Sequence, residues 1–200
     1  LSPGLLAQHC DGKITLAVFP LKTSQVTFGV VDIDSKGPEA QTLITSLITK
    51  AISLGLTPLL EPSGRKGYHI WFLMKQFVEA QLVKHLVTRL VEVAVGGRVP
   101  PAVEIFPKQV GNVELGNSIK LPFGVHRVSS KRTLFIDLST RQPFDDWGLI
   151  AIERCPSITA EQIKGLLVQL GATPKPDTVQ SDSKGKKARR HKGMLLCYPQ

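Results

Sequence analysis

Two aspartates separated by one residue end an apolar stretch and could hold a divalent cation. Phe28-Gly29-Val30-Val31 leads directly into Asp32-Ile33-Asp34. Side chains alternate along a strand, so Asp32 and Asp34 project to one face while Ile33 points into the core. Like charges on one face repel each other, and a hard cation such as Mg²⁺ or Mn²⁺ resolves that conflict. A strand end with two solvated acids explains the pair equally well.

A basic loop with two glycines, Ser63-Gly64-Arg65-Lys66-Gly67, has the composition of a phosphate-binding turn. Ser63 offers a hydroxyl, Arg65 a fork of donors and Lys66 a point charge, and the glycines let backbone N–H groups approach an anion. His69 follows on a strand and can donate to a phosphate oxygen. The GxxxxGK[ST] spacing of a Walker A loop is absent. A surface hairpin with solvated charges remains the alternative.

A third acid, Glu104, lies inside the apolar segment Val103–Phe106. A lone carboxylate in such a strand is costly unless it is paired or binds a metal. The alternative is an edge strand with Glu104 in water, paired with Lys108. Further donors follow this segment: Asn117, Lys120, His126 and Arg127.

Strand and helix patterns alternate around these residues. Strands are expected at Lys13–Phe19, Gln25–Asp34, Pro58–Glu61, Tyr68–Met74, Val103–Phe106, Ser118–Leu121 and Thr133–Leu138. Helices are expected from Ser35 to Gly55, over Val78–Val95 and from Thr159 to near Gly171, the last capped by Ser157 or Thr159. This order predicts an α/β or α+β domain with a mixed sheet.

Composition narrows the class of protein. The net charge of +9 favours a polyanionic partner such as nucleic acid or nucleotides. Three widely spaced cysteines form no CxxC pair, which argues against a zinc cluster and is typical of a reducing cytoplasm. No apolar run is long enough to cross a membrane, and the first residues do not form a signal peptide.

The acid pair, the loop with its histidine and the third acid resemble, in order and spacing, the archaeo-eukaryotic primase (AEP) superfamily. The segments Glu104–Gln109 and Gly116–Pro122 and the Gly124-Val125-His126 tripeptide resemble its primase-polymerase branch in prokaryotic conflict systems and CRISPR loci. The loop is also similar to that of the polymerase domain of bacterial end-joining ligases. The resemblance covers about Lys13 to Leu170. One departure is that the third acid is Glu104, where Asp is commoner.

The resemblance implies an α+β catalytic core with an RRM-like mixed sheet beside an N-terminal α/β module. It implies metal binding of two Mn²⁺ or Mg²⁺ ions by Asp32, Asp34 and Glu104, which would be the catalytic residues. It also implies nucleotide binding, and the expected nucleotide-binding residues are Ser63, Arg65, Lys66, His69, Lys120 and His126. Asp137 is the second choice for the third metal ligand, although its position after Lys120 does not fit the family order.

The implied activity is template-directed nucleotidyl transfer by a DNA primase-polymerase, with attack of a 3′-hydroxyl on the α-phosphate, pyrophosphate release and primer initiation. Expected partners are a single-stranded DNA template or primer-template and a dNTP or NTP. We expect a prokaryotic cytoplasmic monomer that forms part of a larger multidomain protein. Residues 1–172 would be the catalytic domain, and residues 173–200 a basic flexible linker or the start of a further segment.

Two other functions fit parts of the pattern. A non-catalytic nucleic-acid-binding module could share an RRM-like sheet, but the aromatic-rich strands typical of RRM domains are absent. A metal-dependent nuclease could use the same carboxylates but would not need the loop from Ser63 to His69. The basic run Lys184–Lys192 is either a solvated linker or a non-specific template contact that weakens with salt.

Overall fold

A computed structural model describes residues 2–111, 116–156, 158–172 and 196–199. Its main sheet has four strands in the order β3-β4-β2-β5, formed by Leu59–Pro62, Tyr68–Glu79, Gln25–Ile33 and Val103–Phe106. With helices α2 (Pro38–Ser53) and α3 (Ala80–Val95), the chain order is β-α-β-β-α-β. This is the split βαβ arrangement of RRM-like domains, so the expected RRM-like core is confirmed.

The strand pairings are antiparallel throughout the two sheets formed by the named strands, which corrects the expectation of a mixed sheet. The physical reason is that β4 inserts between β2 and β3. The two strands joined by α2 therefore never pair with each other. A parallel contact occurs as the isolated bridge between Met74 and Ile158. The α+β class is confirmed.

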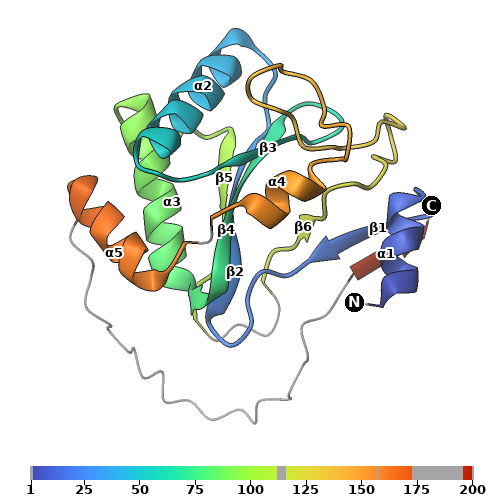
Figure 1. Ribbon diagram of the computed structural model, residues 1–200, viewed down its shortest axis with the longest axis horizontal. Helices are drawn as coiled ribbons and strands as arrows, with labels where there is room; N and C mark the ends of the chain where they lie inside the picture. The colour runs from blue at the N-terminus through green and yellow to red at the C-terminus, as the bar shows by residue number, and fades with distance from the viewer. Residues whose placement is uncertain (1, 112–115, 157, 173–195, 200) are drawn as a thin grey trace.

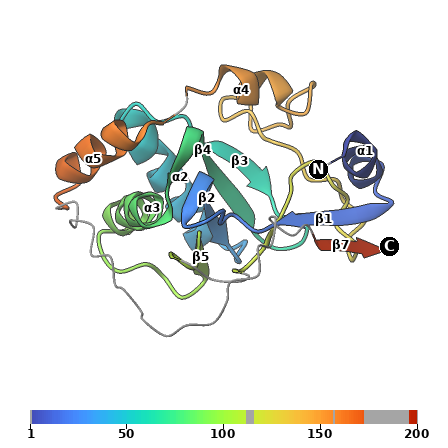
Figure 2. The ribbon, with the colours of Figure 1, turned by 90° about the horizontal axis from the view of Figure 1, so that it is seen from below.

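Helices α2, α3 and α5 (Ala160–Gln169) cover one face of the four-stranded sheet (Figures 1 and 2). Each contributes apolar residues at helical spacing to one core, such as Leu43, Ile44 and Leu47 on α2. The matching sheet residues include Ile33, Ile70 and Phe72. Thr159 caps α5 with a capping box, which confirms one of the two caps expected there.

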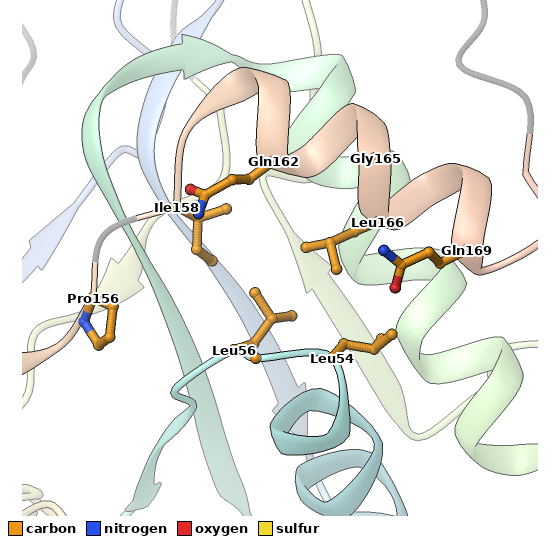
Figure 3. Close-up of a pocket in the computed structure, with 9 residues that line it drawn as sticks. Leu54, Leu56, Pro156, Ile158, Gln162, Gly165, Leu166 and Gln169 are labelled. Atoms are coloured by element: carbon orange, nitrogen blue, oxygen red, sulfur yellow. The ribbon is translucent and has the colours of Figure 1, made fainter.

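A small apolar hollow of about 240 Å³ opens where α5 meets the turn between α2 and β3 (Figure 3). Leu54 and Leu56 face Ile158 and Leu166 across it, and Gln162 and Gln169 stand at its rim. None of the described helices is both long enough and apolar enough to span a membrane.

A second, three-stranded sheet has the order β6-β1-β7, from Ile119–Lys120, Ile14–Val18 and Leu196–Pro199. With helix α1 (Pro3–Cys10) it forms a module beside the main sheet, on the side away from α3 and α5 (Figures 1 and 2). The basic run Lys184–Lys192 lies outside the described residues. The division into a catalytic domain and a tail at residue 172 stays a prediction.

The expected strand Thr133–Leu138 is wrong. Thr133 and Phe135 are buried and their neighbours are half-buried, which is the alternation of a strand. The backbone, however, bonds to turns and loops on both sides and touches β3 at the single bridge between Ile136 and Leu60. Helix α1 and the short helix α4 (Leu149–Arg154) were not predicted. Helix α4 has no fully buried residue, so it carries little amphipathic pattern.

Candidate active site

One row of polar side chains crosses the four-stranded sheet. Glu61 on β3 pairs with His69 on β4, His69 pairs with Asp32 on β2, and Asp32 pairs with Glu104 on β5. Direct partners on antiparallel strands point to the same face. Ile33 and Ile70, the next residues along β2 and β4, belong to the core under the helices, so the row lies on the opposite face. Three acids and a histidine from four strands therefore lie on one face of the sheet.

An apolar row runs beside the polar one on the same face. Leu59, Trp71, Val30 and Phe106 are partners two residues further along the same strands, and all four are buried. With Ile119 and Phe135 they form a second, smaller core. This packing fixes the strands at the point where the charged side chains emerge.

His69, Asp32 and Glu104 of this row line an open cleft of about 550 Å³, whereas Glu61 is buried beneath it. Every residue expected from the sequence to bind metal or nucleotide lines it: Asp32, Asp34, Ser63, Arg65, Lys66, His69, Glu104, Lys120 and His126. Lys108, Asn117 and Ser118 also contribute. Asp137 does not line this cleft, and its carboxylate accepts hydrogen bonds from Ser139 instead. The geometry brings the residues together, while the role of each stays a prediction.

Asp32 is the most sheltered of the three predicted metal ligands, with 27% of its side chain exposed. Burial raises its pKa above the ordinary value, and the nearby charges of Glu104 and Asp34 raise it further. His69, whose Nε2 lies 3.7 Å from Asp32 Oδ1, and Lys108 oppose that rise. A bound cation would stabilise the ionised form of such a carboxylate.

Two lysines balance the other acids. Lys66 Nζ lies 3.1 Å from Asp34 Oδ2, and Lys108 Nζ lies 2.6 Å from Glu104 Oε2. Because β5 is an edge strand, Glu104 is 51% exposed, so burial does not impose the cost expected from the sequence. The structure thus has the edge strand and the Lys108 pair of the alternative interpretation, and it also places Glu104 opposite Asp32.

A divalent cation fits this cleft by the chemistry of its donors. Carboxylate oxygens are the ligands that Mg²⁺ and Mn²⁺ prefer, and Asp32, Asp34 and Glu104 offer them from two adjacent strands and the end of one of them. Within the described residues, however, no three His, Cys, Asp or Glu side chains are already grouped closely enough to hold an ion. Lys66 and Lys108 supply positive charge at two of the acids instead.

The loop from Ser63 to Gly67 joins β3 and β4, as expected, and closes on itself through the Ser63 N–H to Gly67 carbonyl bond of 3.0 Å. Gly67 has φ +142°, and a Cβ there would lie 2.2 Å from the Ile33 carbonyl oxygen. Glycine is therefore required to bring the loop against the end of β2. This contact sets Arg65 and Lys66 beside the aspartate pair.

A second loop, residues 124–133, packs on the first. The Ser129 hydroxyl donates to the Gly64 carbonyl, and the Ser129 N–H donates to His126 Nδ1 at 3.3 Å. Burial lowers the pKa of His126, and the charges of Lys120 and Arg65 lower it further. Three basic residues of the cleft, His126, Lys120 and Arg65, therefore lie close enough to influence one another.

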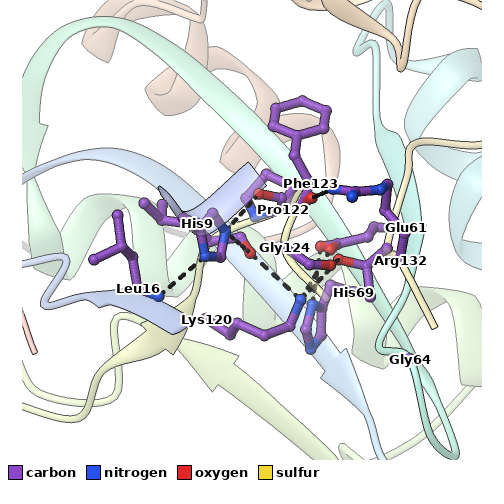
Figure 4. Close-up of polar contacts among 12 residues, drawn as sticks. His9, Leu16, Glu61, Gly64, His69, Lys120, Pro122, Phe123, Gly124 and Arg132 are labelled. Atoms are coloured by element: carbon purple, nitrogen blue, oxygen red, sulfur yellow. Dashed lines mark hydrogen bonds and ion pairs between the residues drawn. The ribbon is translucent and has the colours of Figure 1, made fainter. Parts of the chain in front are cut away.

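Glu61 is the acid that sequence reasoning missed. It is fully buried, and its Oε2 accepts a hydrogen bond from His69 Nδ1 at 3.1 Å (Figure 4). The same oxygen accepts from Trp71 Nε1 at 3.0 Å. Lys120 Nζ lies 3.5 Å from Oε1. Burial favours the neutral acid, but the His69 hydrogen bond and the Lys120 charge outweigh it and lower the pKa of Glu61. The signal was available, because Glu61 follows apolar residues in a short strand, and Glu104 also lies in a short apolar strand.

His9 ties the N-terminal module to the cleft (Figure 4). Its Nδ1 accepts from the Leu16 N–H at 3.1 Å, so its Nε2 carries the hydrogen and donates to the Pro122 carbonyl at 3.0 Å. Gly124 leaves room for the ring, since a Cβ there would lie 2.1 Å from it. This buried ring seats the segment that directly follows Lys120. No role was expected for His9 from the sequence.

Comparison with known proteins adds one informative match. A family model described as the archaeo-eukaryotic primase domain of the TOTE conflict system matches residues 1–166. None of the curated proteins compared with the chain matches it.

Two solved structures are similar at low identity. The AEP domain of the cyanophage S-2L primase-polymerase is 13% identical, covering 76% of this chain and 94% of that chain, with a TM-score of 0.32. The polymerase domain of Ligase D from Mycobacterium tuberculosis, solved in complex with DNA, is 15% identical, covering 74% of this chain and 53% of that chain, with the same TM-score. Values this low carry no conclusion about function.

Proposed function

The chain belongs to the archaeo-eukaryotic primase domain family of TOTE conflict systems, and from this premise we propose that it is a template-directed DNA primase-polymerase. One observation carries the proposal. Three acids and a set of cationic donors line the same open cleft. A nucleoside triphosphate beside a growing 3′ end needs both acids and cationic donors. The acids hold metal ions, and the cationic donors neutralise the triphosphate charge while the α-phosphate is attacked.

Asp32, Asp34 and Glu104 would hold one or two Mn²⁺ or Mg²⁺ ions. When bound, such ions lower the pKa of an attacking hydroxyl and stabilise the charge on the leaving oxygen. The ions would displace Lys66 from Asp34 and Lys108 from Glu104, and both lysines could then contact the phosphates.

The cationic side of the cleft would bind the triphosphate. Ser63, Arg65 and Lys66 come from the β3–β4 loop, whose backbone folds tightly against β2. His69 and Lys120 emerge from strands and both contact Glu61, which limits the orientations of their side chains. His126 stands beside the loop at Gly64. These donors would orient the α-phosphate for attack by the 3′-hydroxyl.

A single assay separates this function from the alternatives. Labelled dNTPs or NTPs are incubated with the protein, a single-stranded DNA template and manganese. Products longer than the substrate, with a sequence set by the template, support the proposal. Shortened template would indicate a nuclease, and bound but unchanged template would indicate a binding module. Omitting any primer tests whether the protein starts chains unaided.

A further inference from the structure

We infer that Glu61 is a positioning residue that fixes His69 and Lys120 for the triphosphate, an inference that rests on the proposed function. Glu61 touches none of the reacting atoms, because its carboxylate is fully buried beneath the cleft. Three donors from two strands converge on it: Trp71 and His69 on β4, and Lys120 on β6 of the other sheet. One carboxylate therefore joins the two sheets at the cleft.

The contact with His69 selects the orientation of the imidazole ring. An ionised carboxylate can only accept, so the 3.1 Å contact with Oε2 places a hydrogen on His69 Nδ1. That leaves Nε2 as the atom presented toward Asp32 Oδ1, 3.7 Å away. Without Glu61, the ring could turn over or exchange its hydrogen between the two nitrogens. A carboxylate orients the histidine of many active sites in the same way.

The contact with Lys120 places a flexible side chain. Lys120 Nζ is held by Glu61 at 3.5 Å and donates to Thr133 Oγ1 at 2.7 Å and to the Leu121 carbonyl at 3.3 Å. Only 17% of the Lys120 side chain is exposed. An ammonium held in this way loses little conformational freedom when a phosphate arrives, so Glu61 would strengthen nucleotide binding without touching the nucleotide.

Glu61→Gln is the sharpest variant because it keeps the shape of the side chain. Oε2 accepts from two donors and Oε1 faces a third. An amide has one acceptor atom, so whichever way it turns, its NH₂ group opposes either Lys120 or the Trp71 and His69 pair. Glu92→Gln is the matched control, since it removes the same charge from a half-buried pair with Arg89 outside the cleft.

The first test measures the affinity for dATP by calorimetry, with and without manganese. Glu61→Gln should weaken dATP binding by about 10- to 100-fold, which is the usual effect of removing a partner that orients a ligating side chain. Glu92→Gln should stay within about twofold of the wild type. In extension assays the KM for dATP should rise more than kcat falls. A folded Glu61→Gln protein with wild-type affinity would overturn the inference.

The second test uses the wild-type protein and so does not depend on the variant folding. Nitrogen-15 NMR of labelled histidine, assigned with His69→Gln, should find a hydrogen on His69 Nδ1 at neutral pH. A bare Nδ1 would overturn the inference. If the proposed function is wrong, the wild-type protein will extend no template. The hydrogen on His69 Nδ1 and the affinity for dATP would still test the role of Glu61.

Discussion

Asp32 and Glu104 are direct partners across the antiparallel pairing of β2 and β5, so two acids face each other beside the open edge of the sheet. Each also has a neighbour of opposite character, His69 for Asp32 and Lys108 for Glu104. The charge of Glu104 raises the pKa of Asp32, so the ionisation of the two acids is linked. Removing the acids should therefore lower activity without lowering the stability of the folded protein.

Replacing both aspartates, with Asp32→Ala and Asp34→Ala together, should abolish synthesis in manganese or magnesium and leave the fold intact. The melting temperature should be unchanged or higher, because burial and the neighbouring acids make ionised Asp32 unfavourable in the folded protein. Primer extension and calorimetric melting check the two parts. Asp11→Ala, which removes an acid paired with Lys13 on the surface, is the control. Normal extension by the double variant would refute the metal assignment.

Lys66→Ala should raise the dissociation constant for dATP by about tenfold, the lower end of what a charged hydrogen bond contributes, because Lys66 is exposed to solvent. The loss should shrink at high salt, which already screens the lysine in the wild type. Binding measured in low and high salt tests both statements. Lys164→Ala on the exposed face of α5 should have no effect. Equal affinities for both variants would remove Lys66 from the nucleotide site.

Gly67→Ala should destabilise the protein by about 2 kcal/mol or more, because the positive φ is strained for alanine and the new Cβ meets the Ile33 carbonyl at 2.2 Å. The same clash displaces the backbone at Asp34, so metal affinity should fall as well. Gly37→Ala is the matched control, since Gly37 has φ −64° and open space around it. Urea unfolding and manganese titration measure the two effects. If both variants unfold at the same urea concentration, the close approach of the loop is wrong.

The stability contributed by Glu61 should depend on pH in a defined direction. Its pKa is lowered in the folded protein, so the contribution is complete above the ordinary value of 4.5 and is lost as pH falls through the folded value. Glu61→Gln should therefore be less stable than the wild type by about 2 kcal/mol or more at pH 7. The difference should narrow at pH 3.5. A difference that stays constant between these pH values would contradict the lowered pKa.

Nucleotide binding should take up a proton near His126. Burial and the charges of Lys120 and Arg65 lower its pKa, and a bound triphosphate adds negative charge that raises it again. Below pH 6.5, nucleotide binding should therefore tighten as pH falls from the His126 pKa of the complex toward the lower His126 pKa of the free protein. Calorimetry in buffers of different ionisation enthalpy reports the proton. His126→Gln should abolish the uptake, and an unchanged uptake would assign the proton to another group.

Much of the cleft was predictable because its residues follow local patterns. The alternation of apolar and acidic residues places Asp32 and Asp34 on one face of a strand without any knowledge of the sheet order. The glycines likewise indicate the tight loop between β3 and β4. The family match confirms the resemblance. The sequence left the edge position of β5 as an alternative, because strand order depends on contacts between distant residues; Glu104 is 51% exposed there. The roles assigned to these side chains stay predictions.

The missed features depend on contacts between distant residues. Glu61 and Lys120 are 59 positions apart, and His9 and Pro122 are 113 apart, so no periodic pattern links them. The segment around Phe135 alternates like a strand because it packs against the apolar row, although its backbone bonds to turns. In each case tertiary packing, and not local preference, decides the structure.

The buried ring of His9 has a practical consequence for where this domain can be cut. Helix α1 contributes no side chain to the cleft, so a shortened protein starting at β1 would keep every predicted site residue. It would nevertheless lose the hydrogen bond that anchors Pro122, two residues beyond Lys120. We therefore expect the smallest active fragment to include helix α1, upstream of the first residue that lines the cleft.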